Sequence, residues 1–178
     1  MGVVNYKKAE KLLIKINKKY PNVIKHCKAV SRFAYKVAKQ IKKNGYDVDP
    51  EKVRVAALLH DIGRGRNHEF HEFEGAKILR KMGEKELANI VLRHGCSSVI
   101  AKELCIPGDF EPKTLEEKIV AYADGRFDND RQVTLKQRYA LLKKRVTKER
   151  WKIIAKTKRR AFRTEKEIKK MLQKNRAL

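Results

Sequence analysis

Apolar residues recur three and four positions apart along most of the chain, which is the spacing of one buried face of an α-helix. Leu12, Leu13 and Ile16 predict a first helix over residues 5–19, which Pro21 ends. Later helices are predicted over residues 50–60, 71–82, 84–94, 98–104, 114–126, 131–146 and 148–173. Because no stretch shows a convincing strand pattern, the sequence predicts an all-α fold.

Several predicted helices carry recognisable start and stop residues. A long second helix begins at the cap residue Asn22 and ends at Gly45, a residue type that favours the conformation found just past a helix end. Asp49 followed by Pro50 is typical of a helix start, and Thr114 begins a capping box. The segments rich in glycine or proline are predicted loops, at 61–67 and 105–113.

Length and composition favour one compact folded unit. The chain has 178 residues, of which 42% are hydrophobic, and this share is too high for a disordered polycation. Its three cysteines are an odd number without a CxxC pair, which argues against a disulfide framework. No apolar run approaches the roughly 20 residues that span a bilayer, and the N-terminus lacks the apolar stretch of a signal peptide. We therefore expect a soluble cytoplasmic protein without a membrane partner.

The charge is strongly positive and unevenly distributed. The formal net charge is +24, from 45 Lys and Arg residues against 21 Asp and Glu residues. Residues 131–178 hold 19 basic and 3 acidic side chains, a net charge of +16, whereas residues 1–130 hold 26 and 18, a net charge of +8. No Ser/Gly linker separates these two parts. We therefore predict a body over residues 1–130 and a basic helical extension, residues 131–178, packed on it.

Side chains that can bind a metal recur at the ends and on the apolar faces of the predicted helices. They are His26, His60, Asp61, His71, His94 and Asp124. Taken singly, a histidine on an apolar face is more often a core residue with satisfied hydrogen bonds, and one acid at a helix end can be of no consequence. Taken together, imidazoles and carboxylates from several helices favour a metal site in the core of a helical bundle, and their mixed N and O donors suit a divalent cation.

The order of these residues resembles the HD superfamily of metal-dependent phosphohydrolases. Residues 58–63, Leu-Leu-His-Asp-Ile-Gly, are similar to the signature of that family, and residues 71–76, His-Glu-Phe-Glu-Gly-Ala, are similar to its His-then-Gly-Ala helix start. Residues 121–124, Ala-Tyr-Ala-Asp, resemble its last metal-ligand segment. The resemblance covers roughly residues 20–128. It implies an HD-type helical bundle with a metal site in its core, to which the basic C-terminal helices are added.

The resemblance also implies a ligand set. A first ion would bind His26, His60, Asp61 and Asp124, and a second would bind His71 and His94 with Asp61 as the bridge. The chain thus looks like the members with room for two metals, including the branch that hydrolyses dinucleoside polyphosphates. One or two divalent ions are expected, from Mn, Fe, Co, Ni and Zn, with Mg as a further candidate. They would activate water for attack at phosphorus, with Asp61 and Arg64 as catalytic residues.

Three arginines near these motifs are candidate ligands for substrate phosphate. Arg64 and Arg66 lie on a glycine-flanked loop directly after Asp61, and Arg126 lies two residues beyond Asp124. Guanidinium groups hold phosphate oxygens by charge-assisted hydrogen bonds. Arg64 stands where several relatives in the HD superfamily have lysine. The alternative for these arginines, above all for Arg66, is a solvated surface position.

Three further polar residues flank His71. His68 is expected to lie exposed in the loop. Glu69 and Glu72 are either acids that assist the site, by supporting a ligand or as a general acid, or solvated acids. Their spacing does not distinguish these roles.

Two functions remain open. An enzyme would hydrolyse a phosphate ester or anhydride bond of a nucleotide or related phosphorylated small molecule by metal-activated water. A binding module would hold a metal or nucleotide and bind RNA through residues 131–178, with little or no catalysis. The charges of that extension can also simply face water while its apolar residues pack on the body. The complete set of ligand-type residues favours the enzyme, and the sequence does not indicate an oligomeric state.

Overall fold

The chain folds almost entirely into helices. A computed structural model describes residues 4–173. Its α-helices are α1 (Tyr6–Ile16), α2 (Pro21–Lys43), α3 (Pro50–Leu59), α4 (His71–Lys81), α5 (Lys85–Arg93), α6 (Ser97–Glu103), α7 (Leu115–Gly125), α8 (Leu135–Arg145) and α9 (Lys148–Gln173). The other regular elements are a 3-10 helix, η1 (Ile62–Gly65), and an antiparallel hairpin of β1 (Phe127–Asp128) and β2 (Arg131–Gln132). The all-α prediction is confirmed.

Local sequence signals act at several helix ends. The Asp49 side chain accepts hydrogen bonds from two backbone N–H groups in the first turn of α3. Thr114 and Thr134 each form a capping box at the start of α7 and α8. Gly45 has a φ of +87°, in the left-handed region that a residue with a Cβ atom rarely adopts. These signals set where the helices that carry the site begin.

Replacing Asp49 by alanine is expected to lower the free energy of unfolding by about 1 kcal/mol, because two N–H groups of α3 lose their acceptor. Urea denaturation of the variant and the parent measures this difference. The exposed Asp47, two residues earlier, provides a matched control, and Asp47→Ala is expected to change stability by less than about 0.5 kcal/mol. Equal losses in both variants would contradict the capping role.

The start of α2 differs from the prediction. Pro21 begins α2 instead of ending the first helix, and α1 ends earlier, at Ile16. Proline is tolerated in the first turn of a helix because the N–H that it lacks has no partner within the helix there. Asn22 therefore lies inside α2 and not at its cap.

Two other segments also differ from the prediction. Residues 131–134 are not helical, because the chain first forms the short hairpin and α8 begins only after the cap Thr134. Residues 62–65, predicted as part of a loop, form η1. Both differences involve elements of two to four residues, which are too short to produce a periodic pattern.

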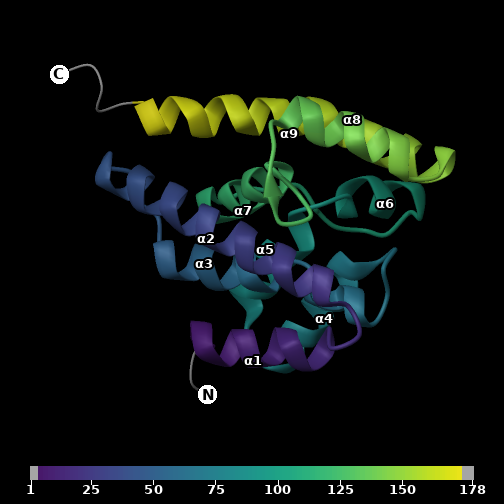
Figure 1. Cartoon of the computed structure of the whole chain (residues 1–178), viewed down its shortest axis with the longest axis horizontal. Helices are drawn as coiled ribbons and strands as arrows, with labels where there is room; N and C mark the ends of the chain where they lie inside the picture. The colour runs from purple at the N-terminus through teal and green to yellow at the C-terminus, as the bar shows by residue number, and fades with distance from the viewer. Residues whose placement is uncertain (1–3, 174–178) are drawn as a thin grey trace.

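The helices pack around one main hydrophobic core. Helix α2 packs along α3 and α7, and α4 packs against α5 and η1. Helices α1 and α9 lie on opposite sides of the molecule (Figure 1). The fully buried side chains of the core include Leu13, Ile41, Leu58, Leu59, Ile119 and Ile168, from α1, α2, α3, α7 and α9. Because Ile168 belongs to α9, the basic extension contributes to the same core as the body.

Helices α8 and α9 form a helical pair along one side of the molecule, and α9 lies across α7 (Figure 1). A second small cluster of buried side chains, Leu135, Tyr139 and Ile154, packs between them. The far end of α9 is fixed by Asn44, whose Nδ2 atom donates a 2.7 Å hydrogen bond to the Met171 carbonyl oxygen. None of the described helices combines the length and the apolarity that crossing a membrane requires.

Candidate metal centre

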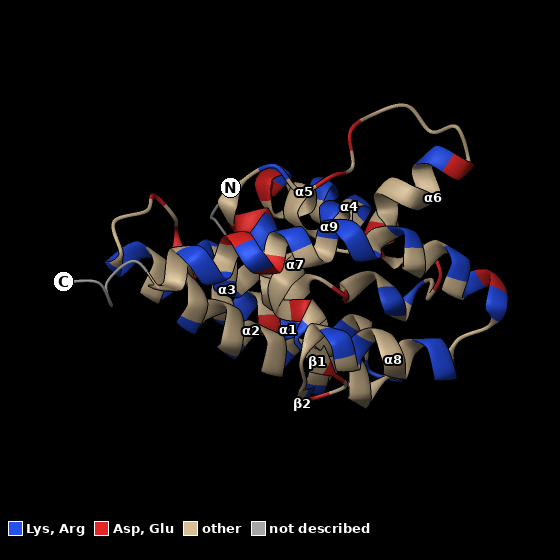
Figure 2. Ribbon diagram, turned by 90° about the horizontal axis from the view of Figure 1, so that it is seen from above, with Lys and Arg blue, Asp and Glu red and all other residues tan. Residues whose placement is uncertain are grey.

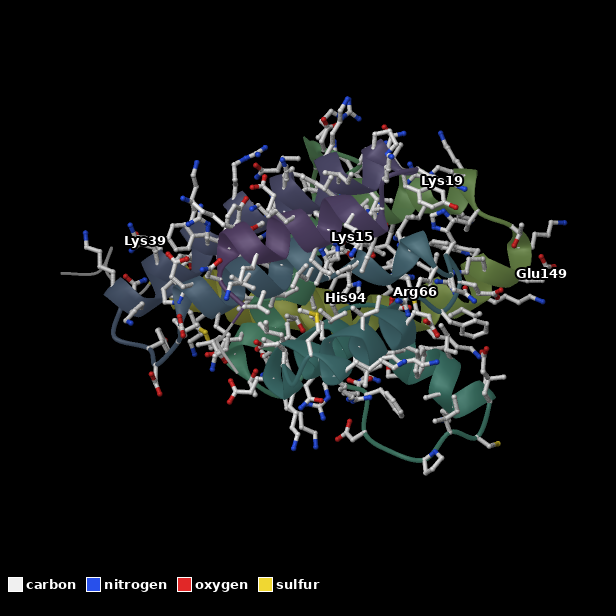
Figure 3. All side chains as sticks on the ribbon, turned by 90° about the horizontal axis from the view of Figure 1, so that it is seen from below. Lys15, Lys19, Lys39, Arg66, His94 and Glu149 are labelled. Carbon is white, nitrogen blue, oxygen red and sulfur yellow. The ribbon has the colours of Figure 1, made fainter. Side chains whose placement is uncertain are left out.

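The six predicted ligand-type residues meet at one place in the interior, and we call them the His/Asp cluster. They are His26 on α2, His60 and Asp61 directly after α3, His71 at the start of α4, His94 directly after α5 and Asp124 near the end of α7. The first five are at most 6% exposed. Figure 3 shows His94 in the middle of the molecule and Lys39 toward its edge. Residues up to 98 positions apart therefore form one buried polar centre.

One part of the cluster gathers around the Nε2 atom of His26. This atom lies 3.0 Å from Asp124 Oδ1 and 3.2 Å from His60 Nε2. Asp61 Oδ2 lies 3.7 Å from His60 Nε2. The ligand atoms of His26, His60 and Asp61 all lie within 4.8 Å of one another, a spacing that allows them to bind one cation.

The Asp61 carboxylate joins this part to the other two histidines. Its Oδ1 atom lies 3.0 Å from His71 Nε2 and 3.7 Å from His94 Nε2, and these three residues form a second possible ligand set. Among the described residues, nothing donates a hydrogen bond to this buried oxygen. A buried carboxylate oxygen without a donor is costly unless a cation compensates it. Asp61 thus has the position expected of a ligand shared between two ions.

Each histidine of the cluster is fixed by a backbone carbonyl oxygen near its Nδ1 atom. The carbonyls are those of Asn129 at 2.6 Å from His26, Ala57 at 2.7 Å from His60, His68 at 3.1 Å from His71 and Val91 at 2.6 Å from His94. Because a carbonyl oxygen only accepts, the neutral rings carry their proton on Nδ1 and present the Nε2 lone pair to the cluster. Hydrogen bonds of this kind orient metal-binding histidines.

Electrostatics keep both carboxylates of the cluster ionised and favour a neutral His60. Burial alone would raise the pKa of Asp61, but the Arg64 guanidinium and the His60 imidazole hold that pKa well below its usual range. Burial also opposes ionisation of Asp124, yet the neighbouring His26 and His60 imidazoles keep the pKa of Asp124 well below its usual range. Burial lowers the pKa of His60 and so favours its neutral form. Ionised carboxylates and neutral imidazoles are the forms that bind divalent ions, so the donor set fits a metal.

Two glycines let η1 and α4 approach closely behind the cluster. A Cβ atom on Gly63 would overlap the His71 carbonyl oxygen and would lie 2.6 Å from the backbone nitrogen of Gly75. A Cβ atom on Gly75 would lie 2.8 Å from the Val91 side chain. The glycines of the two motifs thus set the distance between Asp61, which precedes η1, and His71, which begins α4.

Glu72 supports the cluster from behind. Its side chain is 1% exposed, and its Oε1 atom accepts a 2.8 Å hydrogen bond from the Cys96 backbone N–H. Its Oε2 atom lies 3.3 Å from His71 Nδ1. Glu72 therefore ties the turn after His94 to the start of α4. Glu69 is exposed in the loop, as is His68, which packs edge-on against Tyr20.

Two cavities open onto the cluster. One, of about 140 Å³, is lined by His71, His94 and Asp124, and the other, of about 310 Å³, is lined by His26 and Asp61. Much of their remaining wall comes from α8 and α9. The basic extension therefore covers the metal centre.

Of the three predicted phosphate ligands, the structure brings Arg64 to the cluster. Its Nε atom donates a 2.6 Å hydrogen bond to Asp61 Oδ2, and its side chain lines both cavities. Arg66 is exposed to solvent and lines neither cavity. Arg126 donates to the Val133 carbonyl oxygen and the Tyr122 hydroxyl, and also lies outside both cavities.

Sequence reasoning left the role of Glu72 open, although Glu72 shares a buried face of α4 with Gly75 and Leu79 at helical spacing. Three other residues of the site were not singled out. The Asn129 carbonyl oxygen has no sequence signal, since any residue supplies a carbonyl. Arg138 and Arg150 line both cavities but are two of the 19 basic residues in the extension.

The chain is similar in sequence to several known proteins. The chain is 46% identical over 133 residues to an uncharacterized protein of Methanocaldococcus jannaschii, covering 71% of this chain and 79% of that protein. It is 39% identical over 121 residues to a tRNA (cytidine(56)-2'-O)-methyltransferase of Picrophilus torridus, covering 65% of this chain and 34% of that protein. It is 36% identical over 107 residues to ribonuclease Y of Thermosipho melanesiensis, covering 58% of this chain and 18% of that protein.

The chain matches only a minor part of the methyltransferase and of ribonuclease Y. No solved structure matches the chain significantly. The HD domain family matches residues 23–129, a range that contains all six residues of the His/Asp cluster. Because this match covers more than half of the sequence and ends just after Asp124, the chain belongs to the HD domain family, whose members are generally metal-dependent hydrolases.

Proposed function

We propose that the chain is a metal-dependent phosphohydrolase that cleaves a phosphate ester or anhydride bond of a nucleotide or a related phosphorylated small molecule. The observation that carries this proposal is the His/Asp cluster, in which four Nε2 lone pairs and two ionised carboxylates converge next to two cavities. A purely structural histidine core would not need a carboxylate oxygen buried without a donor.

The cluster residues would hold one or two divalent ions. His26, His60, Asp61 and Asp124 would bind the first, and His71, His94 and the bridging Asp61 would bind the second. A divalent ion at such a site supplies acidification of water and polarisation of a phosphoryl oxygen. Asp61 and Asp124 balance the positive charge, and the carbonyl-bound histidine rings keep their Nε2 atoms directed inward without rearrangement.

Arg64 is the protein group best placed to hold the substrate. Its Nε atom is bound to Asp61, and its Nη2 atom lies 3.3 Å from His71 Nε2 at the edge of the cluster. Its side chain is 30% exposed, so it reaches both the buried cluster and the cavities. Arg64 would donate to the oxygens of the reacting phosphate and stabilise the negative charge that develops there.

RNA binding through the water-facing side of α8 and α9 is a second candidate function. Lys and Arg residues recur along the ribbons of both helices (Figure 2). Two of the relatives carry names that refer to RNA, a tRNA methyltransferase and ribonuclease Y. A basic surface of this kind would attract the phosphate backbone of RNA without reading its sequence.

Removal of the metal is expected to abolish hydrolysis. The purified protein is analysed for bound metal and assayed with a panel of nucleoside mono-, di- and triphosphates, dinucleoside polyphosphates and a short single-stranded RNA. Treatment with a chelator is expected to lower turnover of the active substrate by at least about a hundredfold, because the divalent ion contributes several kcal/mol to transition-state stabilisation. Adding back Mn²⁺ or another divalent ion should restore it.

Protein treated in parallel with the metal-saturated chelator is the control for damage during treatment. Metal-free protein with unchanged activity, or metal-loaded protein inactive on the whole panel, would contradict the enzyme. RNA binding without hydrolysis of any panel member would favour the second candidate.

A further inference from the structure

The two cavities next to the His/Asp cluster meet beneath the basic extension. Five side chains line both of them, Arg64, Arg138, Leu142, Arg150 and Ile154. Four of these five come from α8 and α9, and two of the four are arginines. The wall that faces the metal centre is therefore positively charged, although the cluster itself carries two carboxylates.

Acidic side chains compensate only part of this charge. Arg138 Nη1 lies 2.9 Å and Arg145 Nη2 lies 2.7 Å from the same oxygen of Asp128, so two guanidinium groups share one carboxylate. Arg64 is paired with Asp61. Arg145 lines the larger cavity beside Arg138. These contacts leave an excess of positive charge where the cavities meet.

Arg150 adds to this excess. It lies in the first turn of α9, where its backbone N–H donates a 3.2 Å hydrogen bond to Thr147 Oγ1. Its Nη1 atom is buried and, among the described residues, has no hydrogen-bond partner. A buried guanidinium nitrogen without an acceptor is costly, and an anion in the cavity would supply that acceptor. Arg150 thus has an unused donor in the wall of the two cavities that adjoin the metal centre.

These arginines lie outside the part of the chain that matches the HD domain family. The HD domain match ends at residue 129, before Arg138, Arg145 and Arg150. The groups that would perform hydrolysis lie within the match, and the arginines of the extension lie outside it. A role in choosing the substrate suits residues with this distribution better than a role in the chemistry.

We infer that Arg150, supported by Arg138, binds a second phosphate group of the substrate, one that is held but not cleaved, next to the phosphate that reacts at the metal centre. This inference rests on the proposed function, in which Arg64 and the His/Asp cluster bind the reacting phosphate. Arg64 lines the cavities together with Arg138 and Arg150, so adjacent phosphates of one ligand can reach both groups. A guanidinium group donates two parallel hydrogen bonds to phosphate oxygens, which suits this task. Linked phosphates occur in nucleoside polyphosphates and along a nucleic acid strand, and both present this chemistry.

Binding of two probes that cannot be hydrolysed tests the subsite. Calorimetry on the metal-loaded protein compares orthophosphate with methylenediphosphonate, which carries two linked phosphonate groups. Arg150→Ala is expected to weaken binding of methylenediphosphonate by roughly tenfold to a hundredfold, because a charge-assisted hydrogen bond is lost, and to leave orthophosphate binding within about twofold. Arg150→Lys should recover part of the loss, since it keeps the charge but not the paired donors.

Arg159→Ala is the matched control, because it removes an exposed arginine from the same helix. It changes the net charge equally and should leave both affinities unchanged. Any affinity of the bound metal for the diphosphonate is common to all four proteins, so the difference isolates Arg150. Thermal unfolding verifies that each variant is folded. Equal loss of both probes in Arg150→Ala, or an equal loss of the diphosphonate in Arg159→Ala, would overturn the inference.

Displacement of the bound diphosphonate separates the two sources of linked phosphates. Displacement by α,β-methylene adenosine diphosphate assigns the subsite to a nucleoside polyphosphate, and displacement by a 5'-phosphorylated oligoribonucleotide assigns it to a nucleic acid strand. Displacement by neither overturns the inference. These binding measurements need no turnover, so they test the subsite even if the protein hydrolyses no substrate. Absence of hydrolysis would count against the proposed function and would leave the subsite to be judged by binding.

Discussion

Replacing Asp61 by asparagine is expected to remove bound metal and to lower phosphohydrolase activity by at least about a hundredfold. Asparagine keeps the shape of the side chain but removes the charge that both ligand sets use, because Asp61 Oδ2 faces His60 and Oδ1 faces His71 and His94. Elemental analysis of the purified variant measures the metal, and the assay with the active substrate measures turnover.

The exposed Asp47 offers a matched control, since Asp47→Asn makes the same chemical change at a residue outside the cluster and both cavities. This control is expected to keep metal and activity. The two variants must also remain folded, which circular dichroism establishes. An Asp61→Asn variant with the metal content and turnover of the parent would refute the assignment of the cluster as the catalytic centre.

Replacing Gly63 by alanine is expected to destabilise the fold by about 3 kcal/mol, at the upper end for an added methyl group in a packed interior. The new methyl group would overlap the backbone of His71 and Gly75, and backbone cannot rotate out of the way as a side chain can. For a chain of this length this corresponds to a decrease of about 6–12 °C in the melting temperature. The metal content should also fall, because η1 and α4 must separate and His71 moves away from Asp61.

Gly125→Ala provides the comparison for stability. A Cβ atom there would meet only the end of the Leu135 side chain, at 3.0 Å, and that side chain can adjust. The expected loss is below about 1 kcal/mol. Equal melting temperatures of the two variants would show that the close approach of the two motif glycines is not needed for folding.

The metal centre could be predicted from the sequence because its chemistry is concentrated in short segments. His60 and Asp61 are adjacent and follow an apolar helix, and each of the other ligands also lies on or next to an apolar helical face. Burial of such a face carries the polar residue into the core, whatever the exact arrangement of the helices. The periodicity that predicts the helices therefore also predicts where the ligands point.

The phosphate-binding side could be predicted only in part. Arg64 lies three residues after Asp61, and a short local turn brings the two side chains together. Arg126 is equally close to Asp124 in sequence, but the structure binds it to Tyr122 and Val133 instead. A short separation in sequence does not determine where a side chain points at the end of a helix, because the backbone there departs from regular helical geometry.

The cavity-lining position of the arginines in the extension could not be predicted from the sequence. Arg138 and Arg145 are seven residues apart, on the same face of α8 as Leu135 and Leu142, so their face can be read from the sequence. What that face covers depends on how α8 packs on α9 and how α9 packs on α6 and α7, which is a long-range property. The net charge of +16 suggested an outer surface for polyanions, whereas several of these charges line the inner cavities.

The hairpin between α7 and α8 joins the extension to the ligand set. Asp128 is bound by Arg138 and Arg145, and the next residue, Asn129, offers the carbonyl oxygen that orients His26. A chain shortened after residue 130 would lose this anchoring together with its basic helices, so weaker RNA or substrate binding by it would have two causes. Charge reversal at exposed residues of α9, such as Lys158 and Arg159, alters the outer surface alone. The HD domain match ends at residue 129, inside this hairpin. The chain cannot be divided there without disturbing the contact that orients His26.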